Sequence, residues 1–333
     1  MTVLIIAEAG VNHDGELTTA LRLVDAATDC GADIVKFQTF TADSLATPDA
    51  DKAEYQKVTT SIKETQFEML RKLELSHTDH LVIIERCQER GIGFLSTGFD
   101  IESVNMLMGL EIDRIKIPSG EITNLPYLRH IGGLGRPIIL STGMADLEEV
   151  RSALDVLLSA GTPKEDVTVL HCTTEYPAPM CDVNLQALVT MRDAFGVNVG
   201  YSDHTMGHEV AVAAVALGAC VIEKHLTLDR TAAGPDHSAS LEPAEFADMV
   251  RAIRNIELAL GNGIKIPQPS EIDNMAVARK SLVAAAAIRE GDQFTSVNIT
   301  TKRPGSGLSP MLLDDVLGRK ATRDFAPNEM IEL

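Results

Sequence analysis

The sequence predicts an α/β protein, a (β/α)8 TIM barrel followed by a small C-terminal domain. Short apolar runs rich in β-branched residues alternate with amphipathic segments of helical period, which is typical of βα units and a parallel sheet. Eight runs occupy about 260 residues, and this number and length match a (β/α)8 barrel. The first run is not followed by a GxGxxG motif, which makes a doubly wound open sheet the weaker alternative.

The runs predicted as strands are short and apolar, as in strands that are buried on both faces. In chain order they read VLIIAEAG, DIVKFQTF, GFLSTGF, RIKIPSG, PIILSTG, VTVLHCTT, VNVGYSDH and CVIEKHLTL. The last run is unusual because it includes Glu223, Lys224 and His225, and buried charges need a compensating partner. Alternation along a strand puts Glu223 and His225 on one face and Lys224 on the other.

The segments between these runs have a helical period. They predict helices at 17–30, 78–90, 101–109, 125–131, 147–160, 185–195, 209–217 and 243–260. A long polar stretch separates the second strand from the second of these helices, and its part 41–63 is predicted as a loop. Loops of this length are usually functional lids or flexible segments.

The character of the sequence changes after residue 260. The stretch GNGIKIPQPSE is rich in Gly, Pro and polar residues, so 261–275 is predicted as a linker. Residues 276–333 then form a second region, and a region this small rarely has a sufficient core of its own. The predicted organisation is a barrel at 1–260, a linker and a small C-terminal domain.

Composition and charge exclude several classes of partner. Hydrophobic residues make up 45% and charged residues 23%, as in an ordinary soluble protein. The formal net charge of −19 disfavours binding to nucleic acid and to anionic membranes. No apolar stretch reaches the roughly 20 residues of a membrane span, and the N-terminus lacks the features of a signal peptide. We therefore expect a cytoplasmic protein whose five scattered cysteines are reduced.

Functional side chains gather at the ends of the predicted strands. In a (β/α)8 barrel the active site lies at the carboxyl ends of the strands. The candidates there are Glu8, Lys36, Gln38, Thr97, Phe99, Lys116, Ser119, Ser141, Thr142, Tyr176, Ser202, His204, Glu223 and His225. Several are i, i+2 pairs that share a strand face, such as Glu223 and His225. We predict that this face looks into the barrel mouth, onto a ligand.

Two lysines indicate an anion site in this acidic protein. Lys36 and Lys116 both have apolar neighbours at strand ends, which favours anion binding over the snorkelling surface charge that a lone strand lysine usually is. Ser119 and Ser141, each close to a glycine, are compatible with simple turns. Small hydroxyls and free backbone N–H groups beside lysines also suit a phosphate, which is the favoured interpretation.

Two histidines indicate a metal site. His204 and His225 end adjacent strands, so their neutral imidazoles are expected to converge, and such a pair suits a catalytic divalent metal. The alternative is a pair of hydrogen-bonded structural histidines. His13 and His171 are interpreted as structural, whereas the sequence leaves the role of His237, in GPDHSAS, undecided.

These residues stand in motifs that resemble a known family. IAEAGVNHDG, KFQTF, STGFD, KIPSGE, LSTGM, HCTTEYPAP, GYSDHT, EKHLTLD, GPDHSAS, ARKSLVA and TKRPGSGLSP run through essentially the whole chain. Together they resemble the bacterial sialic acid synthases, a family that includes legionaminic acid synthases. One departure is Gly98 where the family often has proline, which loosens the loop after the third strand.

The resemblance implies a fold, a reaction and an assembly. It implies a C-terminal SAF, or antifreeze-like, domain after the barrel, and a homodimer in which this domain covers the partner's barrel. The implied reaction joins phosphoenolpyruvate to N-acetylmannosamine, or to a close relative, and yields a nine-carbon 2-keto acid and phosphate. The implied cofactor is a divalent metal, Mn²⁺ or Mg²⁺.

The resemblance also implies roles for individual residues. Those expected to bind phosphoenolpyruvate are Lys36, Thr97, Lys116, Ser119 and Ser141. Those expected to contact the sugar are Glu8, Gln38, Phe99, Tyr176, Asp236 and, from the SAF domain, Arg303. The expected metal ligands are His204 and His225, supported by Ser202 and Glu223. The expected catalytic groups are Glu8, Lys116, His204 and His225.

Other functions remain as alternatives. N-acetylmannosamine, giving N-acetylneuraminate, is the expected sugar, with 2,4-diacetamido-2,4,6-trideoxymannose, giving legionaminic acid, as the alternative. A synthase of seven- or eight-carbon sugar acid phosphates would need a second basic subsite, and no Arg cluster stands at a strand end. A non-catalytic sugar-phosphate sensor would leave Glu8 and both histidines without a purpose.

Overall fold

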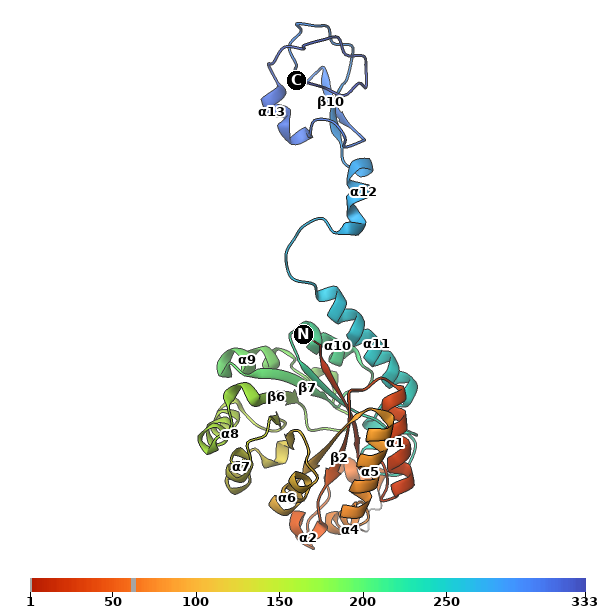
Figure 1. Cartoon of the computed structure of the whole chain (residues 1–333), viewed down its shortest axis with the longest axis vertical. Helices are drawn as coiled ribbons and strands as arrows, with labels where there is room; N and C mark the ends of the chain where they lie inside the picture. The colour runs from red at the N-terminus through yellow and green to blue at the C-terminus, as the bar shows by residue number, and fades with distance from the viewer. Residues whose placement is uncertain (1, 61–63) are drawn as a thin grey trace. The chain divides into compact units, whose positions relative to one another are not determined.

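The computed structural model describes residues 2–60 and 64–333, which form two units (Figure 1). One unit extends to Gly261 and the other spans Asn262–Leu333. The first unit is the predicted (β/α)8 barrel, with eight parallel strands that close in chain order. The strands are β1 (Leu4–Gly10), β2 (Ile34–Thr39), β3 (Gly93–Gly98), β4 (Ile115–Ile117), β5 (Ile138–Ser141), β6 (Val167–Cys172), β7 (Asn198–Asp203) and β8 (Val221–His225).

Helices surround this barrel (Figure 1). They are α1 (Leu17–Asp29), α5 (His77–Arg90), α6 (Ile101–Gly109), α7 (Leu125–Gly132), α8 (Leu147–Ala160), α9 (Gln186–Phe195), α10 (Glu209–Ala216) and α11 (Pro243–Leu260). Their ends follow local signals in the sequence. Ser76 and Asp79 form a capping box at the start of α5, and Gly91 ends this helix in the left-handed conformation.

The polar stretch after β2 contains three short helices, α2 (Ala42–Leu45), α3 (Glu54–Thr59) and α4 (Gln66–Arg71). The segment 41–63, predicted as a loop, thus includes two helices, and its residues 61–63 lie outside the described part. Helix α2 starts at Ala42, whose backbone N–H donates to the Glu74 carboxylate at 2.7 Å.

The interior of the barrel is layered along the strands. An apolar cluster is formed by one side chain from each of six strands, namely Ile6, Ile34, Leu95, Ile139, Leu170 and Val221. Gly200 of β7 contributes no side chain because a Cβ there would lie 2.5 Å from Leu170 Cδ2. The residue two positions later on each strand points to the same side of the sheet. The next layer, at the carboxyl ends of the strands, is therefore a polar layer. Its residues are Glu8, Lys36, Thr97, Ser141, Cys172 and Glu223.

The second unit has a small core of its own. It contains α12 (Pro269–Ala278), β9 (Ser281–Ala284), β10 (Ile299–Lys302) and α13 (Leu313–Val316), and β9 pairs antiparallel with β10. Its core residues are Leu282, Ala284, Ile288, Phe294, Ile299, Val316, Ala321, Phe325 and Ile331. Helix α12 occupies part of the segment predicted as a linker, where Gln268 and Glu271 form a capping box that the composition conceals. No described helix has both the length and the apolar character needed to cross a membrane.

Candidate functional site

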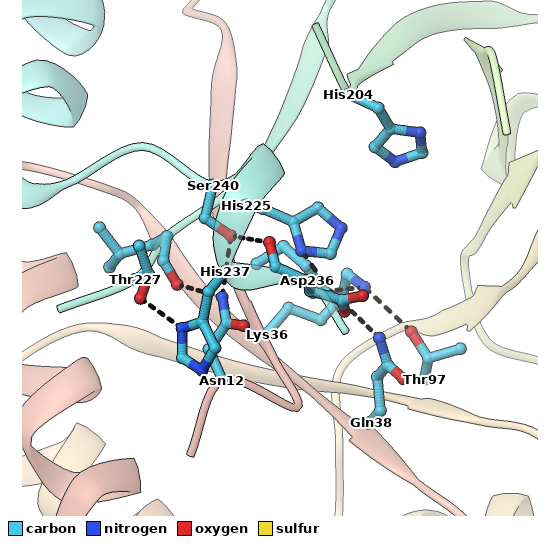
Figure 2. Close-up of polar contacts among 12 residues, drawn as sticks. Asn12, Lys36, Gln38, Thr97, His204, His225, Thr227, Asp236, His237 and Ser240 are labelled. Carbon is cyan, nitrogen blue, oxygen red and sulfur yellow. Dashed lines mark hydrogen bonds and ion pairs between the residues drawn. The ribbon is translucent and has the colours of Figure 1, made fainter. Parts of the chain in front are cut away.

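The first lysine of the polar layer is held by two carboxylates. Lys36 Nζ lies 2.6 Å from Glu8 Oε2 and 3.6 Å from Glu223 Oε2. It donates a hydrogen bond of 3.0 Å to Thr97 Oγ1 (Figure 2). Parallel pairing sets this arrangement, because Glu8 of β1 is the register partner of Lys36 on β2. All four side chains are buried, so their charges interact far more strongly than on the surface.

The second lysine shares one of these carboxylates. Lys116 Nζ donates to Ser141 Oγ at 2.8 Å and lies 3.6 Å from Glu223 Oε1. The Ser202 hydroxyl donates to the same Glu223 oxygen at 2.9 Å. Glu223 therefore lies between the two lysines. This partnership explains how a run built like a buried strand tolerates a carboxylate.

Burial and neighbouring charges give the carboxyl groups of Glu8 and Glu223 very different pKa values. Burial raises the pKa of Glu8 to about 7, although Lys36 opposes this shift. Burial also disfavours the ionised form of Glu223, but Lys116 and Lys36 outweigh it and lower the pKa of Glu223 to about 2. Burial lowers the pKa of Lys116, while Glu223 and Glu8 outweigh burial at Lys36 and raise its pKa. Glu8 is thus the carboxyl group of the pair that can exchange a proton near neutral pH.

A cavity of about 190 Å³ opens onto this layer. Its lining includes thirteen of the residues predicted from the sequence, namely Glu8, Lys36, Gln38, Thr97, Phe99, Lys116, Ser119, Ser141, Tyr176, Ser202, His204, Glu223 and His225. Five further lining residues were not predicted as contacts, namely Pro118, Gly120, Met144, Cys172 and Thr174. Cys172 belongs to the same strand face as Leu170, two residues earlier, so strand alternation was a signal that could have identified it.

The end of the cavity beside Lys116 is tightly packed around small groups. The Gly143 N–H donates to Ser119 Oγ at 2.9 Å, and Ser119 Oγ lies 3.3 Å from Cys172 Sγ. A Cβ at Gly143 would lie 2.0 Å from Thr174 Oγ1, which leaves glycine as the residue that fits. The Thr174 hydroxyl is buried and has no hydrogen-bond partner. Lysine, hydroxyl groups and close backbone form an environment that suits a phosphate.

The two predicted metal ligands lie close together at the ends of β7 and β8. The ring centroids of His204 and His225 are 5.5 Å apart, and the Tyr176 ring lies 4.2 Å from the first and 5.6 Å from the second. His204 Nδ1 is 2.7 Å from the Thr173 carbonyl oxygen. A carbonyl only accepts, so Nδ1 carries the proton and Nε2 keeps its lone pair.

These two imidazoles fit a divalent metal. Burial lowers the pKa of His204 to about 4 and that of His225 well below its usual value, so both rings are neutral, as metal ligands must be. His225 Nδ1 is buried without a hydrogen-bond partner. Among the described residues no group of three or more His, Cys, Asp and Glu side chains could hold a metal. The chain thus offers two ligands and leaves further positions for water or substrate, an arrangement that accepts several divalent ions.

Three of the residues predicted to contact the sugar, Glu8, Gln38 and Asp236, lie close together around Gly10. A Cβ at Gly10 would lie 3.3 Å from Gln38 Nε2 and 3.4 Å from both Glu8 Oε1 and Asp236 Oδ2. Asp236 is buried, and its Oδ2 lies 3.8 Å from His225 Nδ1, but it does not line the cavity. Burial raises the pKa of Asp236 to about 6.

Two other residues predicted to contact the sugar are Phe99 and Arg303. Phe99 lines the cavity and packs edge-on against Phe40, with ring centroids 6.0 Å apart. Arg303 belongs to the second unit, where its guanidinium Nε donates to the Ala278 carbonyl oxygen at 3.0 Å.

Lys224 points away from the cavity, as its parity predicts. It is fully buried, and its ammonium group lies 2.9 Å from Asp203 Oδ2 and donates to the Thr205 carbonyl oxygen. Asp203 is its register partner on β7. The pair thus joins the outer faces of the two strands whose inner faces carry His204 and His225.

Comparisons with known proteins show the family to which the chain is similar. A model of the NeuB family matches residues 23–265, and a SAF domain model matches residues 279–332. The chain is 52% identical to an N,N'-diacetyllegionaminic acid synthase of Campylobacter jejuni over 98% of each chain. It is 46% identical to an N,N'-diacetyllegionaminic acid synthase of Legionella pneumophila, over 98% of this chain and 92% of that one.

A solved structure shows the same fold. The N-acetylneuraminic acid (sialic acid) synthetase of Leptospira borgpetersenii, in complex with citrate, superimposes with a TM-score of 0.72 at 35% identity, over 83% of this chain and 90% of that one. The expected SAF domain and the resemblance to sialic and legionaminic acid synthases are thereby confirmed. Because these matches extend over most of its length, the protein belongs to the NeuB family and is an enzyme of this synthase type.

Proposed function

We propose that the protein condenses phosphoenolpyruvate with 2,4-diacetamido-2,4,6-trideoxymannose to give N,N'-diacetyllegionaminic acid and phosphate. The observation that carries the reaction type is one cavity that joins two buried lysines, Glu8 and two neutral histidines. The choice of sugar is supported by the 52% and 46% identity to synthases of this product. N-acetylmannosamine, the sugar first expected, becomes the second candidate, supported by a sialic acid synthetase at 35% identity.

The reaction forms one carbon–carbon bond and breaks one carbon–oxygen bond. C3 of phosphoenolpyruvate attacks the aldehyde carbon of the open-chain sugar, water adds at C2, and phosphate leaves as C2 becomes the keto carbon. Of the two protons of water, one goes to the new hydroxyl group and the other leaves with phosphate. A divalent metal bound by His204 and His225 would polarise the aldehyde.

The residues of the cavity have distinct tasks in this proposal. Lys116, Ser119 and Ser141 hold the phosphate and stabilise it as it departs. Lys36 and Thr97 hold the carboxylate. Glu8 faces the positive charge that develops at C2, and its pKa of about 7 allows it to take the proton from water and pass it on.

The choice of sugar is tested with purified protein, Mn²⁺ and phosphoenolpyruvate. We expect phosphate release with the diacetamido sugar at a kcat/KM at least about tenfold above that with N-acetylmannosamine, because a site built to hydrogen-bond a second amide discriminates against a sugar that lacks it. A Lys116→Ala preparation measures the background. A kcat/KM that favours N-acetylmannosamine would reassign the product to N-acetylneuraminate, and no phosphate release with either sugar would contradict the synthase activity.

We propose further that the protein acts as a homodimer in which Arg303 of one chain completes the sugar site of the other. Arg303 is exposed, and the segment 262–268 that precedes α12 is exposed throughout and contains a proline. Lys116→Ala and Arg303→Ala are each expected to be inactive. After the two variants are unfolded and refolded together, about a quarter of all sites should regain both residues.

This complementation distinguishes a shared site from a site within one chain. If Arg303 serves its own barrel, no pairing of the two variants brings Lys116 and Arg303 to the same site. Mixtures that stay inactive, while wild-type protein recovers through the same protocol, would therefore exclude the shared site.

A further inference from the structure

Two motifs of the sequence, in which so far only Asp236 has a proposed role, lie against each other in the barrel unit. VNHDG forms the turn 11–15 after β1, and GPDHSAS belongs to the loop 226–241 after β8. This loop closes on itself, because the Thr227 N–H donates to the Leu241 carbonyl at 3.0 Å and the Leu241 N–H donates to the His225 carbonyl at 2.9 Å. Figure 2 shows residues of both motifs around Asp236 and His225.

The first connection between the motifs runs through His237. Its ring is almost fully buried, with Nδ1 2.7 Å from Thr227 Oγ1 and Nε2 3.2 Å from both carboxylate oxygens of Asp14. An ionised carboxylate only accepts, so Nε2 carries a proton and donates it to Asp14. The ring is thereby fixed at both nitrogens, between the turn after β1 and the end of β8.

The second connection runs through Asn12. Its side-chain amide donates to Ser240 Oγ and to the Leu226 carbonyl, both at 2.9 Å (Figure 2). Ser240 in turn donates to the backbone carbonyl of Asp236 at 2.7 Å. The turn after β1 therefore holds the loop on both sides of Asp236.

Gly234 belongs to the same arrangement. A Cβ at this position would lie 2.6 Å from the His237 ring and 3.0 Å from Asp14 Oδ1. The backbone of the loop thus passes directly over the contact between His237 and Asp14. This close approach explains the glycine of GPDHSAS.

Asp14, His237 and Thr227 resemble a hydrolytic triad in their order of hydrogen bonds, but they are not one. The Thr227 side chain is fully buried, and its hydroxyl also contacts the backbone carbonyl of Asp229 at 3.1 Å. A nucleophile has to reach a substrate. The arrangement can therefore hold the loop but cannot attack a ligand.

Asp236 is adjacent to His237, so the position of its side chain depends directly on how firmly the loop is held. Its carboxylate is directed to the space above Gly10, within reach of the positions of Gln38 and Glu8, and lies 3.8 Å from His225. We propose that Asp14 and His237 are positioning residues that clamp the loop 226–241 and so hold Asp236 where the sugar substrate binds. This inference rests on the function proposed above.

Kinetics of clamp variants test the proposal. Asp14→Asn and His237→Gln are each expected to lower kcat/KM for the sugar by roughly ten- to hundredfold, mostly by raising KM. The reason is that a displaced Asp236 side chain no longer contacts the sugar in the correct geometry. KM for phosphoenolpyruvate should change by less than about twofold, since Lys36 and Lys116 lie on other strands. In an Asp236→Asn background the clamp variants should add little, because their effect passes through Asp236.

A matched control separates the clamp from general destabilisation. The Asp33 side chain is 36% exposed and that of Asp14 42%, and the Asp33 carboxylate also bonds a side chain from a distant part of the sequence, Arg254, but at the other end of the strands. Asp33→Asn should leave the sugar KM unchanged. Equal losses for both substrates, full additivity with Asp236→Asn, or the same sugar effect from Asp33→Asn would overturn the proposal.

Hydrogen exchange tests the clamp independently of turnover. In full-length protein, Asp14→Asn and His237→Gln should speed amide exchange within 226–241 and 11–15, whereas Asp33→Asn should not. Unchanged exchange in both clamp variants would refute the clamp even if the enzyme is active. Faster exchange in a protein that turns over neither sugar would instead support the clamp and refute the proposed reaction.

Discussion

Replacing His204 or His225 by alanine is expected to reduce turnover by about three orders of magnitude or more. A metal that polarises a carbonyl supplies several kcal/mol of transition-state stabilisation, and each loss of about 1.4 kcal/mol is tenfold in rate. The two rings are the neutral, buried imidazoles that line the cavity. With only two side chains offered by the described part of the chain, loss of either leaves too few ligands.

Metal binding provides the measurement that separates this role from folding. Mn²⁺ affinity, followed by electron paramagnetic resonance, should fall in both variants, and excess EDTA should inactivate the wild type reversibly. His171→Ala is the matched control, because His171 of β6 is bonded to the Val183 carbonyl and does not line the cavity. Unchanged Mn²⁺ affinity in both site variants, or a wild type fully active in EDTA, would refute the metal site.

Replacing Lys36 or Lys116 by methionine should weaken phosphoenolpyruvate binding by roughly ten- to hundredfold. Each change removes a charge-assisted hydrogen bond worth about 1.5 to 3 kcal/mol. Calorimetric titration of each variant measures the effect. The charge of the site also becomes more negative, because Glu8 and Glu223 lose a positively charged partner.

Lys224→Met is the control for this experiment. All three lysines are buried, but Lys224 is paired with Asp203 on the opposite face of the strand. Breaking that buried pair should cost about 3–5 kcal/mol of unfolding free energy and leave the affinity for phosphoenolpyruvate unchanged. If the single variant does not fold, Asp203→Leu combined with Lys224→Met removes both charges. Unchanged affinity in Lys36→Met and Lys116→Met would show that the anion binds elsewhere.

The barrel was predictable because its signals are local and repeated. Strand alternation has a period of two, so Glu223 and His225 had to share a face and Lys224 had to take the other, and the structure confirms both placements. The helix limits at 101–109, 147–160 and 243–260 were predicted to the residue, since caps and prolines stand in the sequence itself. Helix α12 was missed because its proline and polar residues also fit a linker.

The partners of the buried charges could not be predicted, because they come from strands far apart in the chain. Asp203 was not recognised as the counterion of Lys224, and the position of Glu223 between two lysines was not predicted. The sequence alone determined which residues face the lumen and in which order they follow one another, since both depend on local periodicity. Only the tertiary structure decided which of them are neighbours and how acidic each becomes, because closing the barrel sets the distances between strands, and burial and neighbouring charges set the acidity.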